Sequence, residues 1–192
     1  MSSPVPQRKF TFREYLELEE VSNTKHEFAQ GEIFAMAGGT PEHAALSMAM
    51  GALLVPQLRN VECRVYSSDL RIRVEETGLT TYPDVTVVCG EAKYDAESSV
   101  TVTNPSLVVE VLSPSTEDYD RGEKLDHYQK IAALKACLLI AQDRPLVELV
   151  LRTAAGWERF PYGASDTVPL PLHGATFGVH ELYDIAGLRF DR

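Results

Sequence analysis

Two runs of the chain, LVVEVL at 107–112 and CLLIA at 137–141, are almost entirely apolar. A strand with one solvated face alternates apolar and polar residues, whereas these runs offer apolar side chains to both faces. Strands of this kind are typical of a sheet that helices cover on both sides. The hydrophobic pattern therefore predicts an α/β fold with a mixed central β-sheet flanked by helices.

Helices are predicted on either side of these runs. Over residues 41–58 apolar residues recur at helical spacing, Thr40 is suited to cap the helix, and Pro41 suits its first position. A second helix is predicted over 119–134, and the tail at 178–188 has the pattern of a short amphipathic helix. The two longer helices are expected to pack against the sheet.

The N-terminal part begins with a capping box, Thr11 and Glu14, which predicts a short helix from about Phe12. Residues 26–39 follow as an expected β-hairpin with Gln30-Gly31 at its turn. Further strands are predicted at 63–78, 81–90, 146–152 and 157–163. With 192 residues, the chain is expected to form one domain, 1–192, with residues 1–10 as a flexible leader.

Composition narrows the function only in part. The net charge of −10 argues against broad, non-specific affinity for DNA, because phosphate contacts need clustered Lys and Arg, although a local basic patch stays open. The cysteines Cys63, Cys89 and Cys137 lie far apart, so neither a disulfide framework nor a zinc site is indicated, and a cytoplasmic location is expected. No apolar stretch approaches the ~18 residues of a spanning helix, so no membrane association is expected.

Glu110 stands in the middle of the first apolar run, where a carboxylate needs a counter-charge or a metal. Asp84 follows Pro83 at the start of another predicted strand. If the two strands pair, both acids converge on one site, and two carboxylates suit Mg²⁺ or Mn²⁺. An ion pair between Glu110 and a Lys or Arg is an equally open alternative.

Lys124 is the second candidate. On the predicted helix it shares a face with Tyr128 and Ile131, at the border of the buried side, from which it can reach the two acids. The alternative is a solvated lysine that pairs with Asp120, four residues earlier.

Three motifs, YPDV at 82–85, VVEVLSPST at 108–116 and DRGEKLDHY at 120–128, resemble the PD-(D/E)xK nuclease superfamily, most closely its Uma-two family of small endonucleases. The resemblance aligns Asp84 with the motif aspartate and Glu110 with the (D/E) position. Where the superfamily expects lysine, two residues later, this chain has Leu112. Lys124 matches the place to which that family has moved the lysine.

The resemblance implies a restriction-endonuclease-like fold and a Mg²⁺-dependent or Mn²⁺-dependent endonuclease that hydrolyses phosphodiester bonds of nucleic acid, with DNA as the expected substrate. Asp84 and Glu110 would hold the metal together with the backbone carbonyl of Val111, and Lys124 would act on the attacking water or the transition state. A homodimer is expected. The alternative function is a nucleic-acid-binding or assembly module that has lost cleavage.

Glu27 and His43 also match positions that recur in the family, where they would extend the metal site or contact the substrate. For Glu27 the alternative is a solvent-facing hairpin acid, and for His43 a surface residue near a helix start. Asp69 has a weaker claim to the site. Ser115 and Thr116 are expected to shape the turn after the Glu110 strand.

Overall fold

The computed structural model describes residues 8–36 and 38–190. Its central sheet has six strands in the order β12-β11-β10-β9-β6-β3. The strands are β3 (Cys63–Ser67), β6 (Val85–Cys89), β9 (Leu107–Leu112), β10 (Ala136–Ala141), β11 (Leu146–Thr153) and β12 (Gly156–Gly163). The β9–β10 pair is parallel and the other four pairs are antiparallel. The predicted mixed central sheet is thus confirmed.

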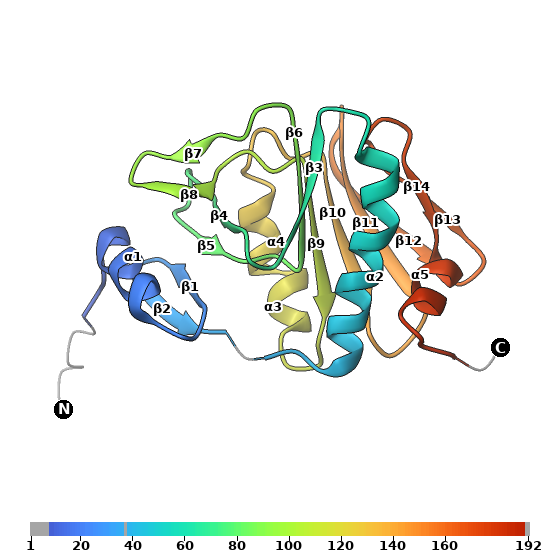
Figure 1. Cartoon of the computed structure of the whole chain (residues 1–192), viewed down its shortest axis with the longest axis horizontal. Coiled ribbons are helices and arrows are strands. Elements are labelled where there is room, and N and C mark those ends of the chain that lie inside the picture. The colour runs from blue at the N-terminus through green and yellow to red at the C-terminus, as the bar shows by residue number, and fades with distance from the viewer. Residues whose placement is uncertain (1–7, 37, 191–192) are drawn as a thin grey trace.

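Helices cover this sheet on both faces (Figure 1). On one face, α2 (Pro41–Leu58) and α5 (Val179–Ile185) pack on Val109 and Leu138, beside the small sheet of β13 (Thr167–Pro169) and β14 (Thr176–Gly178). On the other face, α4 (Glu123–Tyr128) packs on Val108 and Leu139. All six residues of both β9 and β10 are buried, as their apolar runs predicted.

A second six-stranded sheet, in the order β2-β1-β5-β4-β8-β7, lies beside the central one (Figure 1). It contains the predicted hairpin, β1 (His26–Ala29) and β2 (Glu32–Ala35), and is preceded by α1 (Phe12–Val21). Its other strands are β4 (Arg71–Arg73), β5 (Thr80–Thr81), β7 (Tyr94–Asp95) and β8 (Ser98–Val102). The strand predicted over 63–78 is wrong as a single strand, because the chain turns after Ser67 and β4 joins this second sheet while β3 joins the central one. The other strands are mostly too short to produce a periodic pattern, so their assembly into a second sheet was not predicted.

The local signals at the N-terminal part are confirmed. The Thr11 side chain accepts a hydrogen bond from the Glu14 amide, and the Glu14 carboxylate accepts one from the Thr11 amide. Gln30 and Gly31 both have positive φ, 51° and 84°, as a tight hairpin turn requires. Residues 1–7 of the expected leader lie outside the described residues, whereas the Phe10 amide donates to the Gly31 carbonyl and is held by the hairpin.

The predicted single helix at 119–134 is wrong. The chain forms two short helices, α3 (Glu117–Arg121) and α4, which are separated at Gly122, and α4 ends at Tyr128. Gly122 has φ −109° and ψ −104°, which is outside the helical range, and a Cβ there would lie 3.0 Å from the Asp118 carbonyl oxygen. Ile131 therefore lies beyond the helix that carries Lys124.

The prediction that the chain has no disulfide is also wrong. Cys63 on β3 and Cys89 on β6 are directly opposite in the antiparallel register and form a disulfide. The two residues are 26 positions apart in sequence, and only the pairing of the strands brings them together. Cys137 is a buried free cysteine.

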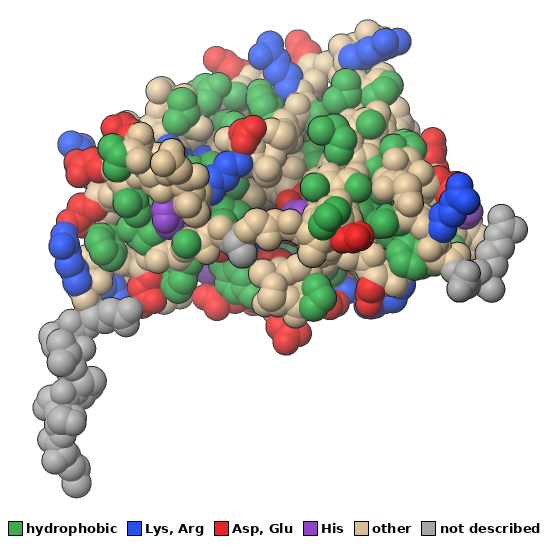
Figure 2. Space-filling model, turned by 60° about the horizontal axis from the view of Figure 1, so that its bottom comes forward, with side chains coloured by type: hydrophobic (Ala, Val, Ile, Leu, Met, Phe, Trp, Pro, Cys, Tyr) green, Lys and Arg blue, Asp and Glu red, His purple; other side chains and the backbone are tan. Residues whose placement is uncertain are grey.

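Two surface properties bear on possible partners. On the face drawn in Figure 2, the described Lys and Arg side chains are scattered among Asp and Glu and form no continuous basic patch. Within residues 8–36 and 38–190, none of the helices combines the length and apolar character needed to cross a membrane.

Candidate active site

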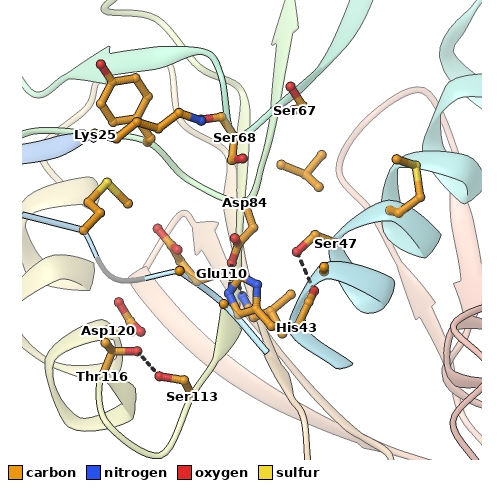
Figure 3. Close-up of a pocket in the computed structure, with 18 of the residues that line it drawn as sticks. Lys25, His43, Ser47, Ser67, Ser68, Asp84, Glu110, Ser113, Thr116 and Asp120 are labelled. Atoms are coloured by element: carbon orange, nitrogen blue, oxygen red, sulfur yellow. Dashed lines mark hydrogen bonds and ion pairs between the residues drawn. The ribbon is translucent and has the colours of Figure 1, made fainter. Parts of the chain in front are cut away.

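The two predicted acids come together because their strands are neighbours. Strands β6 and β9 pair antiparallel with Val85 opposite Val109, so one step further along this register Asp84 stands opposite Glu110. Residues opposite each other on adjacent strands project to the same face of the sheet. Figure 3 shows the two carboxylates and His43 converging on one cavity.

Each of the two carboxylates is anchored through one of its oxygens. Asp84 Oδ2 accepts a hydrogen bond from the Val111 amide at 2.7 Å and lies 3.2 Å from His43 Nε2. Glu110 Oε1 accepts from the Tyr128 hydroxyl and lies 3.0 Å from Lys124 Nζ. Among the described residues, no hydrogen bond is donated to Asp84 Oδ1 or to Glu110 Oε2. The protein thus orients both acids and leaves one oxygen of each available.

Lys124 is buried, with 5% of its surface exposed, so the solvated-lysine alternative is wrong. Its ammonium lies 3.0 Å from Glu110 Oε1, 3.1 Å from Glu27 Oε1 and 3.4 Å from Asp120 Oδ1. The ion pair that was open for Glu110 therefore exists, and Asp120 is a partner as well. The Lys124 ammonium nevertheless faces three carboxylates, and Asp84, which pairs with His43, is a fourth acid nearby. The acids of the cluster therefore outnumber its basic groups.

This arrangement shifts the pKa of both members of the central pair. Burial raises the pKa of the Glu110 carboxyl, the Lys124 ammonium opposes that shift, and the Asp84 and Asp120 carboxylates add to it. Burial alone would lower the pKa of Lys124, but Glu110, Glu27 and Asp120 together raise it well above its usual value. Lys124 stays charged, while Glu110 holds its proton more readily than an exposed glutamate.

Glu27 reaches the cluster from the second sheet. It lies on β1, is 9% exposed, and its Oε1 accepts a hydrogen bond from the Thr81 hydroxyl of β5. The alternative of a solvent-facing hairpin acid is therefore wrong. Because Lys124 bridges Glu27 and Glu110, the two sheets meet at this ion-pair cluster.

His43 is held over Asp84 by the start of α2. Thr40 caps this helix by accepting a hydrogen bond from the His43 amide, and the His43 ring packs against Gly39. A Cβ at Gly39 would lie 2.7 Å from His43 Nδ1, so a side chain there would displace the ring. The hydrogen bond to Asp84 raises the pKa of His43, although burial acts in the opposite direction. His43 is half-buried and not a free surface residue.

Comparison with known proteins was decisive for the family. Residues 12–180 match the Uma2 family, which is described as "Putative restriction endonuclease". This chain belongs to the Uma2 family. It is 38% identical over 190 residues to "Uncharacterized protein slr1290" of Synechocystis sp., covering 98% of this chain and 97% of that protein. It is also 39% identical over 132 residues to "Uncharacterized protein sll1609" of the same organism, covering 69% and 75%.

The fold agrees with this Uma2 membership. A crystal structure of "a putative nuclease belonging to DUF820" from Anabaena variabilis superposes with a TM-score of 0.73 at 16% identity, covering 90% of this chain and 98% of that one. The predicted α/β, restriction-endonuclease-like fold is confirmed. Family and fold together support a nuclease-type function.

Two residues of this Uma2 site were not predicted as members. The sequence pattern places Asp120 only as a surface partner of Lys124, and Tyr128 only as a neighbour on its helical face. Both are buried and contact the Lys124–Glu110 pair. Their spacing from Lys124, four residues to either side, was the signal that could have identified them. Asp69, by contrast, lies on the exposed surface and pairs with Lys25.

Leu112, which replaces the superfamily lysine, is buried in the core against α4. Val111 contributes its amide to Asp84, and its carbonyl as a metal ligand stays a prediction. Ser113 contacts both Ser115 and Thr116 through hydroxyl groups, as expected for the turn after β9.

The acids face a cavity of about 1190 Å³. Its walls are the outer side of α2, the end of β9 with the turn that follows, and residues of the second sheet such as Glu27 and Tyr82. Hydroxyl groups of Ser47, Ser67 and Ser68 lie around it (Figure 3). The volume exceeds that of many small-molecule pockets, about 300–1000 Å³.

Proposed function

We propose that this Uma2 protein is a divalent-metal-dependent endonuclease that hydrolyses phosphodiester bonds of DNA. The observation that carries the proposal is that two oriented carboxylates beside a buried lysine each present an oxygen that accepts no hydrogen bond from the described residues, Asp84 Oδ1 and Glu110 Oε2. An acid pair that served only the fold would be expected to have all its oxygens paired.

The donor set fits a hard cation. Oxygen ligands suit Mg²⁺ or Mn²⁺. Two basic groups, the Lys124 ammonium and the His43 imidazole, face four carboxylates, those of Asp84, Glu110, Glu27 and Asp120. Asp84 and Glu110 would hold the ion, with the Val111 carbonyl as a further ligand. When bound, such an ion polarises a phosphoryl oxygen and lowers the pKa of a water molecule.

The remaining residues have roles that follow from their contacts. Lys124 stays protonated and would stabilise the negative charge that develops on the phosphate, or orient the attacking water. Tyr128 fixes Glu110 through Oε1, and His43 fixes Asp84 through Oδ2, so the other oxygen of each carboxylate would be available to an ion. Glu27 and Asp120 keep Lys124 in place.

The choice of DNA rests on the family description and on the size of the cavity. The net charge of −10 and the scattered Lys and Arg side chains in Figure 2 favour few phosphate contacts, so we expect DNA binding whose affinity depends weakly on salt concentration.

A homodimer would place two such sites on one duplex, and light scattering at several protein concentrations tests whether the protein is a dimer.

The test is cleavage of circular DNA, linear DNA and RNA with Mg²⁺ or Mn²⁺, together with calorimetric titration of each ion. We expect the wild type to cut DNA, Glu110→Gln to lose both cleavage and metal binding, and Lys124→Ala to lose cleavage. Asp118→Asn, an exposed acid on α3, is the matched control and should remain active. Circular dichroism confirms that each variant is folded.

If the folded wild type binds nucleic acid but neither cuts it nor binds a divalent ion, the metal-nuclease proposal is wrong and the binding-module alternative applies. If RNA is cut and DNA is not, the chemistry stands and the substrate assignment is wrong.

A further inference from the structure

A second group of metal-ligating side chains lies away from the acidic cluster. The ligand atoms of Cys63, Cys89 and His173 all lie within 4.8 Å of one another. They come from three segments: β3, β6 and the turn between β13 and β14. Cys89 ends β6, whereas Asp84 precedes it, so about 16 Å of strand separates the two groups.

His173 is presented by a turn that is itself anchored. His173 and Gly174 both have positive φ, 49° and 75°, and the Ala175 amide donates to the Leu172 carbonyl at 2.9 Å. Leu172 and Ala175 on either side are buried in the core. The imidazole is exposed, so it can rotate and solvent can reach the group, while the turn holds its backbone beside the two sulfurs.

The donor set is soft, unlike the carboxylates of the nuclease site. Two thiolates and one imidazole are ligands typical of Zn²⁺, which binds them in a tetrahedron and leaves the fourth position to water. Zinc–ligand bonds of about 2.0–2.3 Å place neighbouring ligand atoms about 3.5–3.8 Å apart. Because the three atoms already lie within 4.8 Å of one another, their separations need to change by only about 1–2 Å to reach that arrangement once the disulfide is reduced.

We propose that, when the Cys63–Cys89 disulfide is reduced, Cys63, Cys89 and His173 form a zinc site that ties the β13–β14 turn to the edge of the central sheet. A dithiol reductant supplies two electrons and two protons, which break the sulfur–sulfur bond and give two thiols, while the reductant becomes a disulfide. Zinc binding then displaces the two thiol protons. The oxidised protein has no free thiolate at this position, so it does not form the site.

The experiment uses the full chain, reduced with a phosphine and kept in excess Mg²⁺ so that the carboxylates are occupied. Co²⁺ is the probe, because thiolate coordination gives it sulfur-to-metal charge-transfer absorption, and Zn²⁺ competition then measures affinity. We expect one equivalent of Co²⁺ to bind with that absorption, Zn²⁺ to displace it, and the unreduced protein to show none.

Variants assign the ligands. Cys63→Ser together with Cys89→Ser should abolish the absorption, and His173→Ala should weaken metal binding at least about 10-fold. His180→Ala removes another exposed histidine, on α5, and should leave the affinity unchanged. The proposal is overturned if the reduced wild type shows no charge-transfer absorption, or if His173→Ala binds Zn²⁺ as tightly as the wild type. His173 is exposed, so its replacement is not expected to impair folding.

Discussion

Two buried glutamates of the central sheet differ in their charge partners, and this difference distinguishes a structural acid from a candidate catalytic one. Glu110 on β9 and Glu148 on β11 both lie opposite Leu139 of β10, in one row across the sheet, and both are buried. Glu148 Oε1 contacts Arg121 and its Oε2 lies 3.1 Å from Arg159, so both of its oxygens are neutralised. Glu110 shares its one lysine with two other acids, and its Oε2 accepts no hydrogen bond from the described residues.

Burial of an acid is therefore a weak indication of function, because ion-pair networks also occupy sheets. The more informative quantity is the local balance of charge and of hydrogen-bond partners. Two arginines neutralise the Glu148 carboxylate, whereas the acids around Glu110 outnumber the basic groups, which favours the binding of a cation. The following predictions test this contrast.

The largest effect is expected from replacing each glutamate by glutamine. Glu110→Gln should lower the rate of DNA cleavage by about 10³-fold, the equivalent of several kcal/mol of lost transition-state stabilisation. Glu148→Gln should leave cleavage nearly unchanged and destabilise the fold by about 1–3 kcal/mol, because it leaves arginine charge unpaired. Single-turnover kinetics and urea unfolding measure the two effects, and equal loss of cleavage in both folded variants would remove the contrast.

Replacing Lys124 by methionine should lower cleavage by about 10²-fold, since a neutral side chain of similar length cannot stabilise phosphate charge. The same change leaves Glu110, Glu27 and Asp120 without a counter-charge, so the metal-free variant should unfold at a lower temperature. Added Mn²⁺ should raise its unfolding temperature more than that of the wild type. A variant insensitive to Mn²⁺ would contradict the idea that a cation can compensate these acids.

Metal affinity should rise with pH. Glu110 and His43 both have raised pKa values, so each keeps its proton to a higher pH than an unperturbed glutamate or histidine would. The ion must displace the proton on Glu110, and a proton on His43 repels it. Raising the pH removes these protons, and affinity should increase by up to about tenfold per pH unit for each proton released. Calorimetry in buffers of different ionisation enthalpy measures the release. Glu110→Gln should abolish metal binding, and with it the release of the Glu110 proton.

The smallest effect concerns the support of His43. Gly39→Ala places a Cβ against the imidazole and should move it from Asp84, which we expect to lower cleavage by about 10-fold. Gly38→Ala is the matched control, because a Cβ at Gly38 meets nothing within 4 Å. Cleavage rates of the two variants, with similar unfolding temperatures, would assign the loss to His43. Equal rates would show that its position does not matter.

The sequence predicted the parts of this site that depend on strands with strong local signals. The apolar run around Glu110 and the Pro83–Asp84 step each indicated a strand, and their antiparallel pairing brought both acids to one face, as expected. Lys124 was also predicted to reach them. That prediction assumed one continuous helix, whereas the structure has two short helices that meet at Gly122. Asp120 and Tyr128 belong to the site because they are buried, and their burial results from the packing of α3 and α4, which the sequence pattern does not show.

What the sequence determined by itself was local: the capped α1 and α2, the Gln30-Gly31 turn, and the two-faced strands β9 and β10, because propensity, capping and periodicity act over neighbouring residues. The tertiary structure decided the contacts between distant segments. It brought Glu27 from the second sheet to Lys124 and set Cys63 opposite Cys89. Strand register is set by packing across the whole sheet, so no local pattern along the chain reports such pairs.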